Sequence, residues 1–99
     1  MLLEKIDKNA VYSFKTVTGE EIITRVSGQD STSYTLLKPL VMISTPQGGF
    51  GLAPAIFSIS PTDSVMLNKR AVALYGKTES DIATQYLQKT TGLTLATSI

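Results

Sequence analysis

Short extended runs interrupted by glycine and proline constrain the fold of this 99-residue chain more than any other feature. The runs that share a high content of Val, Ile, Leu and aromatic residues lie at 11–17, 21–27, 34–44, 50–60, 65–67 and 71–75. The chain also holds 13 Thr and 10 Ser, which with its Val and Ile favour strands over helices. The sequence therefore predicts a mainly β protein.

Turn residues between these runs predict how the strands are joined. Gly19 is free to take a positive φ in the turn at residues 18–20. Residues 45–49 (TPQGG) are the strongest turn signal, and Gly48-Gly49-Phe50-Gly51 reads as a hairpin tip. Pro39 and Pro54 fall inside runs and indicate edges or bends, because proline cannot donate a ladder hydrogen bond. We expect about five strongly bent strands in a small closed SH3-type barrel.

Both ends of the chain carry helical patterns. Residues 2–8 predict a short N-terminal helix, which is marginal alone and must dock on the sheet. Residues 79–91 predict a C-terminal helix capped by Thr78, whose apolar stripe packs on its own barrel or on a neighbouring subunit. The expected organisation is a barrel domain at 1–76, followed by a helix and tail at 77–99.

Composition excludes several kinds of chemistry. The chain has no Cys and no His, which excludes disulfides, thiolate catalysis, Cys/His zinc sites and a Ser-His-Asp triad. Glu20 and Glu21 are the only adjacent acidic pair, and neighbours on a strand point to opposite faces. We expect no catalytic activity, no catalytic residues, no metal site and no cofactor.

Charge and hydropathy bear on location and partners. The formal net charge is +1, so any nucleic-acid site must be a local patch. Charged residues make up 17%, below the usual level of about 25%, which suggests that part of the surface is covered by another molecule, with copies of the chain itself as one option. No run is long enough to span a membrane, and no signal peptide is recognised, so a soluble cytoplasmic protein is expected.

Two motifs carry a resemblance to a known family. Residues 2–26, LLEKIDKNAVYSFKTVTGEEIITRV, resemble the opening of Sm-like (LSm/Hfq) proteins, with Thr18-Gly19-Glu20 as the matching turn. Residues 30–37, DSTSYTLL, lie where the family has an Asp followed by an apolar strand. Residues 66–74, MLNKRAVAL, look like the second family motif, a short strand, a tight basic turn and a final strand. The resemblance covers roughly residues 2–75. Over this range the chain looks like a divergent, phage-type member of the Sm-like family.

The resemblance implies a homo-oligomeric ring that binds single-stranded RNA near a central pore, without catalysis. In such rings the fourth strand of one subunit pairs with the fifth strand of the next, which removes open sheet edges. By analogy with the family, the RNA is U-rich or A/U-rich. Basic residues meet phosphates and an aromatic side chain stacks on a base. The residues to which the resemblance assigns RNA binding are Asn68, Lys69, Arg70, Tyr34 and Asp30.

Other interpretations of the same residues remain open. Lys69 and Arg70 also suit an ordinary polar turn, Tyr34 also suits a packing residue, and Asp30 also suits a turn cap. The ring could instead be a structural or assembly ring, such as a phage component or an adaptor, with no nucleic-acid role. A third possibility is an unrelated small barrel that acts as a monomeric interaction domain. The C-terminal helix could also dock another protein.

Overall fold

The computed structural model describes residues 5–60 and 62–91, and in these residues strands dominate. The strands are β1 (Val11–Thr16), β2 (Glu21–Gln29), β3 (Ser33–Ser44), β4 (Phe50–Pro54), β5 (Ser64–Asn68) and β6 (Val72–Lys77). A short 3-10 turn, η1 (Lys69–Ala71), joins β5 to β6, and the helix α1 (Ser80–Thr91) follows. The mainly β class and the C-terminal helix are confirmed.

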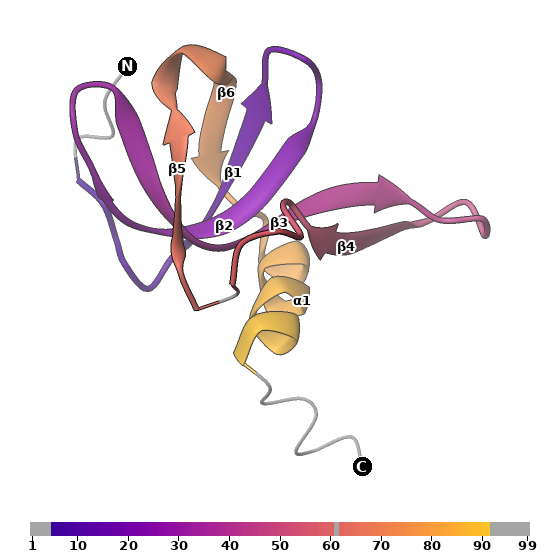
Figure 1. Cartoon of the computed structure of the whole chain (residues 1–99). Helices are drawn as coiled ribbons and strands as arrows, with labels where there is room; N and C mark the ends of the chain where they lie inside the picture. The colour runs from indigo at the N-terminus through magenta and orange to yellow at the C-terminus, as the bar shows by residue number, and fades with distance from the viewer. Residues whose placement is uncertain (1–4, 61, 92–99) are drawn as a thin grey trace.

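One bent antiparallel sheet contains all six strands, in the order β4-β3-β2-β1-β6 with β5 also paired to β3. The long strand β3 makes this possible because it bends at Lys38, which has a φ of 49° and precedes Pro39. The part of β3 before the bend pairs with β5, and the part after it pairs with β4. The β3–β4 hairpin consequently projects from the body of the molecule (Figure 1).

The expected closed five-stranded barrel is wrong in two respects: the described sheet has six strands and is not closed. The predicted run at 50–60 is extended only over β4, to Pro54. Strands β5 and β6 are paired to β3 and β1 respectively and not to each other. The 3-10 turn η1 intervenes between them in place of a two-residue hairpin turn, so β5 and β6 are separate edge strands, as β4 is.

The predicted N-terminal helix is absent from the described part of its range, while residues 2–4 lie outside the described residues. The side chain of Asp7 accepts a hydrogen bond from the amide of Asn9 (2.9 Å), and the carbonyl of Asp7 accepts one from Ala10 (3.0 Å). The amide of Asp7 donates to the hydroxyl of Tyr12 (3.0 Å). Side-chain bonds of this kind compete with helix formation, and they win over a seven-residue helical pattern.

The sheet carries a core cluster on each face, because successive residues of β1 point to opposite sides. Inside the bend, the buried residues are Tyr12, Phe14, Val26, Tyr34, Leu36 and Val72. On the other face, α1 packs its stripe, and the buried residues there are Val11, Ile23, Leu52 and Tyr86. The helix therefore packs on its own sheet, which was one of the two options left open by the sequence.

The start of α1 differs from the prediction in its cap. The carboxylate of Glu79 accepts hydrogen bonds from the amides of Asp81 (3.0 Å) and Ile82 (3.2 Å). The hydroxyl of Thr78, expected in that role, instead bonds the hydroxyl of Ser13 (2.8 Å), while the amide of Thr78 donates to Val11. Thr78 thus continues the contact of β6 with β1, and the negative charge of Glu79 suits the positive end of the helix.

Tyr86 fixes the helix to the bend of β3. Its fully buried hydroxyl donates toward the carbonyls of Leu37 (2.7 Å) and Lys38 (3.0 Å) and accepts from the amide of Arg25 (3.2 Å). Burial raises the pKa of Tyr86 above its usual value. These contacts satisfy backbone groups that the bend at Lys38 leaves outside the regular ladder.

Candidate nucleic-acid interface at two converging turns

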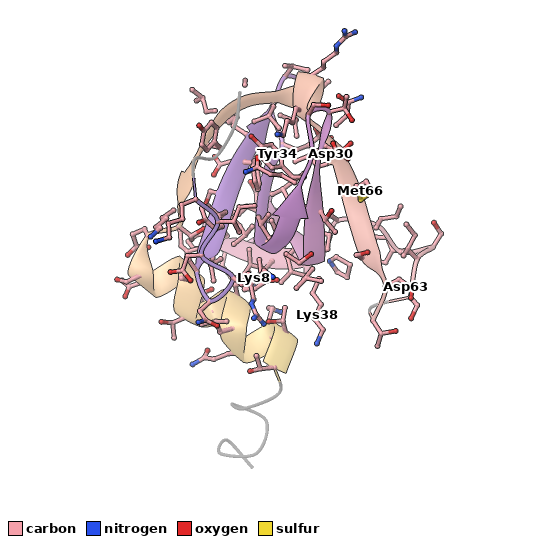
Figure 2. The ribbon with its side chains drawn as sticks, turned by 90° about the vertical axis from the view of Figure 1, so that its left-hand side faces the viewer. Lys8, Asp30, Tyr34, Lys38, Asp63 and Met66 are labelled. Atoms are coloured by element: carbon pink, nitrogen blue, oxygen red, sulfur yellow. The ribbon has the colours of Figure 1, made fainter. Side chains whose placement is uncertain are left out.

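The turn between β2 and β3 meets the turn between β5 and β6 at one end of the sheet. The amide of Lys69 donates to the carbonyl of Thr32 (2.8 Å), and Tyr34 lies opposite Leu67 in the β3–β5 register. Asp30 and Tyr34 lie at this end, whereas Asp63 lies toward the other end of β5 (Figure 2). The structure therefore brings all five predicted site residues into one region.

Asp30 holds its own turn together. Its Oδ1 accepts hydrogen bonds from the amides of Thr32 (2.8 Å) and Ser33 (2.7 Å) and from the hydroxyl of Thr32 (3.1 Å). These bonds, led by the amide of Thr32, hold the pKa of the Asp30 carboxyl below its usual value, and the charge of Lys69 adds to the effect. The turn-cap interpretation of Asp30 matches this geometry.

Lys69 is directed into the protein. Its side chain is buried, and its Nζ donates to the side-chain oxygen of Gln29 (2.9 Å) and to the carbonyl of Asp30. The same ammonium lies 4.8 Å from the centre of the Tyr34 ring, within cation–π range. Lys69 therefore links the two turns, and its positive charge is directed at groups within the subunit and not at solvent.

Tyr34 is a core residue. It is fully buried, and its ring centre lies 4.9 Å from that of Phe14. Burial raises the pKa of the Tyr34 hydroxyl, with a smaller contribution from Tyr75. In this conformation Tyr34 offers no open face on which a base can stack, so the packing interpretation fits it better.

Asn68 and Arg70 complete the second turn. Asn68 is the N-cap of η1, and its Oδ1 accepts from the amide of Arg70 (2.9 Å). The side chain of Arg70 is exposed, and its guanidinium makes no hydrogen bond or ion pair with any residue in 5–60 or 62–91. Of the five predicted residues, Arg70 is the one whose charge faces solvent and has no internal partner among the described residues.

The sequence did not predict the apolar residues that line the sheet edges. Met66 on β5 is 56% exposed, and Leu74 on β6 is 67% exposed. Each edge strand pairs on one side only within the described chain. An exposed, apolar edge is a template for pairing with another strand. The sequence shows Met66 and Leu74 within two short apolar runs. Which face of the sheet each side chain occupies depends on the strand register, which the sequence alone does not give.

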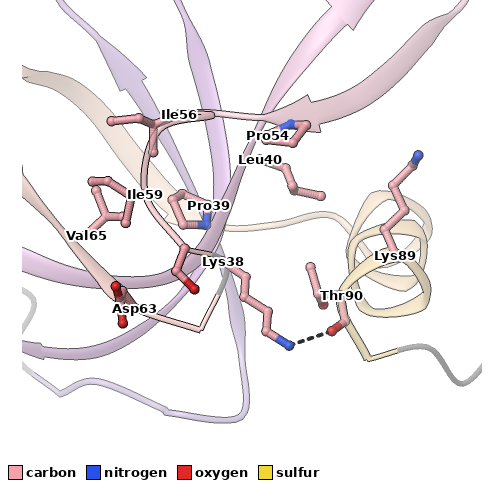
Figure 3. Close-up of a pocket in the computed structure, with 11 residues that line it drawn as sticks. Lys38, Pro39, Leu40, Pro54, Ile56, Ile59, Asp63, Val65, Lys89 and Thr90 are labelled. Carbon is pink, nitrogen blue, oxygen red and sulfur yellow. Dashed lines mark hydrogen bonds between the residues drawn. The ribbon is translucent and has the colours of Figure 1, made fainter.

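A cleft of about 210 Å³ lies between the base of the β3–β4 hairpin, residues 55–60, β5 and the end of α1 (Figure 3). Ile56, Ile59 and Val65 contribute apolar side chains to it. At its rim the ammonium of Lys38 donates to the carbonyl of Thr90 (2.8 Å). This volume is below the range of about 300–1,000 Å³ typical of small-molecule sites.

Comparison with known proteins gives no family assignment: no protein-family model and no curated protein matches this sequence. Within the described residues, no helix has the length and apolar character needed to cross a bilayer. Across the same residues, no group of three or more His, Cys, Asp or Glu is arranged to hold a metal ion.

Proposed function

We propose that the protein is an Sm-like subunit of a closed homo-oligomeric ring, and that the ring binds single-stranded RNA through Arg70. The ring is the part of the proposal with the broader support. Within the described residues β4, β5 and β6 are edge strands, and two of them, β5 and β6, carry the exposed apolar side chains Met66 and Leu74. Pairing β5 of one copy with β6 of the next satisfies both edges at once. Repetition of one heterologous contact closes into a ring when the rotation between copies allows it.

The observation that carries RNA binding is the outward position of Arg70 on a turn that its neighbours hold rigid. Asn68 caps that turn, and Lys69 ties it to the β2–β3 turn. An exposed guanidinium is suited to phosphate contacts and to stacking on a base. Repeated around a ring, Arg70 gives a circle of positive charge although each subunit carries only +1. The preference for U-rich or A/U-rich RNA follows from the family resemblance alone.

Arg70→Gln tests this site, with Lys89→Gln as a control that removes the same charge from an exposed position on α1. With fluorescently labelled oligo-U RNA, we expect Arg70→Gln to raise Kd by about tenfold or more and to reduce the salt dependence of binding. Lys89→Gln should leave Kd nearly unchanged. Equal affinities for Arg70→Gln and the unaltered ring would contradict the site.

A second candidate is a structural or assembly ring without a nucleic-acid role. The inward positions of Tyr34 and Lys69 favour it, because they remove the expected stacking platform and one of the two cations. A closed oligomer that leaves oligo-U RNA unbound at low salt would support this second function and contradict the first.

A further inference from the structure

Residues 55–60, which we call the Phe57 loop, leave the most exposed large apolar side chain in the described chain. Phe57 is 84% exposed, whereas its neighbour Ile56 lines the cleft. The loop is held at both ends: the amide of Ala55 donates to the carbonyl of Pro39 (3.0 Å), and the carbonyl of Ser60 accepts from the amide of Asp63 (3.0 Å). Phe57 is thus presented outward by an anchored loop next to the start of β5.

The two sheet edges are complementary in one particular antiparallel register. If Met66 of one copy lies opposite Leu74 of the next, Asp63 lies opposite Lys77, because each pair of positions is separated by three residues. One register therefore places apolar against apolar and acid against base. In the same register all of β5 lies opposite residues 72–76 of β6 in the next copy. Antiparallel pairing is the arrangement of every strand pair in this sheet.

We propose that Asp63 and the Phe57 loop form a second contact between ring neighbours, in which Asp63 pairs with Lys77 of the next copy and Phe57 covers the beginning of its α1. This inference rests on the proposed ring and adds the partner surface, a second copy of the chain, to it. Asp63 and Lys77 are both exposed in the isolated subunit, and neither makes an ion pair with a described residue. Beyond Lys77 the neighbour's chain continues into α1, so the residues that precede β5 are placed beside the start of that helix.

Engineered disulfides test the contact directly, since the chain has no cysteine of its own. A disulfide requires Cα atoms about 4.4–6.8 Å apart. In the Asp63→Cys/Lys77→Cys double variant we expect oxidation to give a ladder of covalent oligomers on a denaturing, non-reducing gel. The matched control is Asp63→Cys/Arg70→Cys, which places the second thiol at the other end of β6 and should give no ladder.

The outcomes separate this inference from the proposed ring. A ladder from the control pair alone would overturn the antiparallel register, because parallel strands bring Asp63 near Arg70. A closed oligomer in native mass spectrometry with no ladder from either pair would overturn this contact and leave the ring standing. A monomer would overturn both.

The Phe57→Ser variant provides a second readout that does not depend on cysteine chemistry. Its folding stability should match that of the unaltered protein, because Phe57 is exposed within the subunit. Its dissociation constant between subunits should rise by about tenfold or more, measured by sedimentation velocity. Ile43→Ser, at an exposed position on the projecting β3–β4 hairpin, is the control and should associate normally. Unchanged association of Phe57→Ser would overturn the role of the loop.

Discussion

The converging turns and the sheet edges of this protein differ in how fully their side chains are used within the subunit. At the turns, Lys69 and Tyr34 are buried, and the carboxylate of Asp30 accepts hydrogen bonds from backbone amides of its own turn. At the β5 and β6 edges, Met66 and Leu74 are exposed, and no strand of the described residues pairs on their open side. The charged and aromatic residues of the turns, whose types suggest ligand binding, therefore stabilise the fold. The apolar residues of the edges, whose types suggest a hydrophobic core, are exposed to solvent instead. Under the proposed function, this contrast assigns assembly to the edges and RNA contact to Arg70 at the turns.

The largest effect that tests this contrast is expected at Tyr34. Tyr34→Ala removes a fully buried ring that packs on Phe14, so it should lower the free energy of unfolding by about 3–5 kcal/mol. Chemical denaturation measures the change, with Tyr75→Ala, 39% exposed, as a control of smaller cost. A stable Tyr34→Ala variant that has lost RNA affinity would show that Tyr34 is a stacking residue instead.

A smaller effect distinguishes Lys69 from its neighbour Arg70. Lys69→Met keeps a long apolar stem but leaves the side chain of Gln29 and the carbonyl of Asp30 without their donor. We expect it to destabilise the fold by about 1–3 kcal/mol. Arg70→Gln should change stability by less than about 0.5 kcal/mol, because it is a surface substitution. Thermal or urea unfolding of the two variants measures both; the reverse order of effects would refute the assignment of the two cations.

The smallest expected effect is a pH dependence at Asp30. Its folded pKa lies below its unfolded value, so its stabilisation is present above the usual aspartate pKa of about 3.9 and is lost as the pH falls through the folded pKa. Asp30→Asn keeps an oxygen acceptor but cannot titrate. The loss of stability between about pH 6 and about pH 2.5 should therefore be shallower in Asp30→Asn than in the unaltered protein. An equal loss of stability on acidification in the two proteins would contradict the role of the charged carboxylate.

Local signals explain which parts of this fold were predictable from sequence. Gly19 has the positive φ (101°) that its turn predicted, and Gly48 (φ 87°) lies in the turn predicted at residues 45–49. The stripe of α1 was likewise predicted because helical spacing places Ile82 and Tyr86 on one face. Features of this kind depend on a few neighbouring residues, so a single sequence reveals them.

The remaining features depend on contacts between distant segments. The burial of Lys69 requires Gln29 and the carbonyl of Asp30, both supplied by the other turn. The run at 50–60 is a strand only up to Pro54, because only that part pairs with β3 beyond the bend at Lys38. The five candidate site residues lie in one region of the structure, but the direction of each side chain follows from long-range packing that periodicity does not encode.

Native mass spectrometry of the purified protein, with and without a short oligo-U RNA, tests the central claim most directly. We predict a single closed oligomer that gains the mass of one or a few RNA strands. Substitution of Leu74 by Asp should dissociate this oligomer, because it puts a charge on the edge that pairs with the next copy. A monomer at micromolar concentration would contradict the ring, and with it the role of both sheet edges.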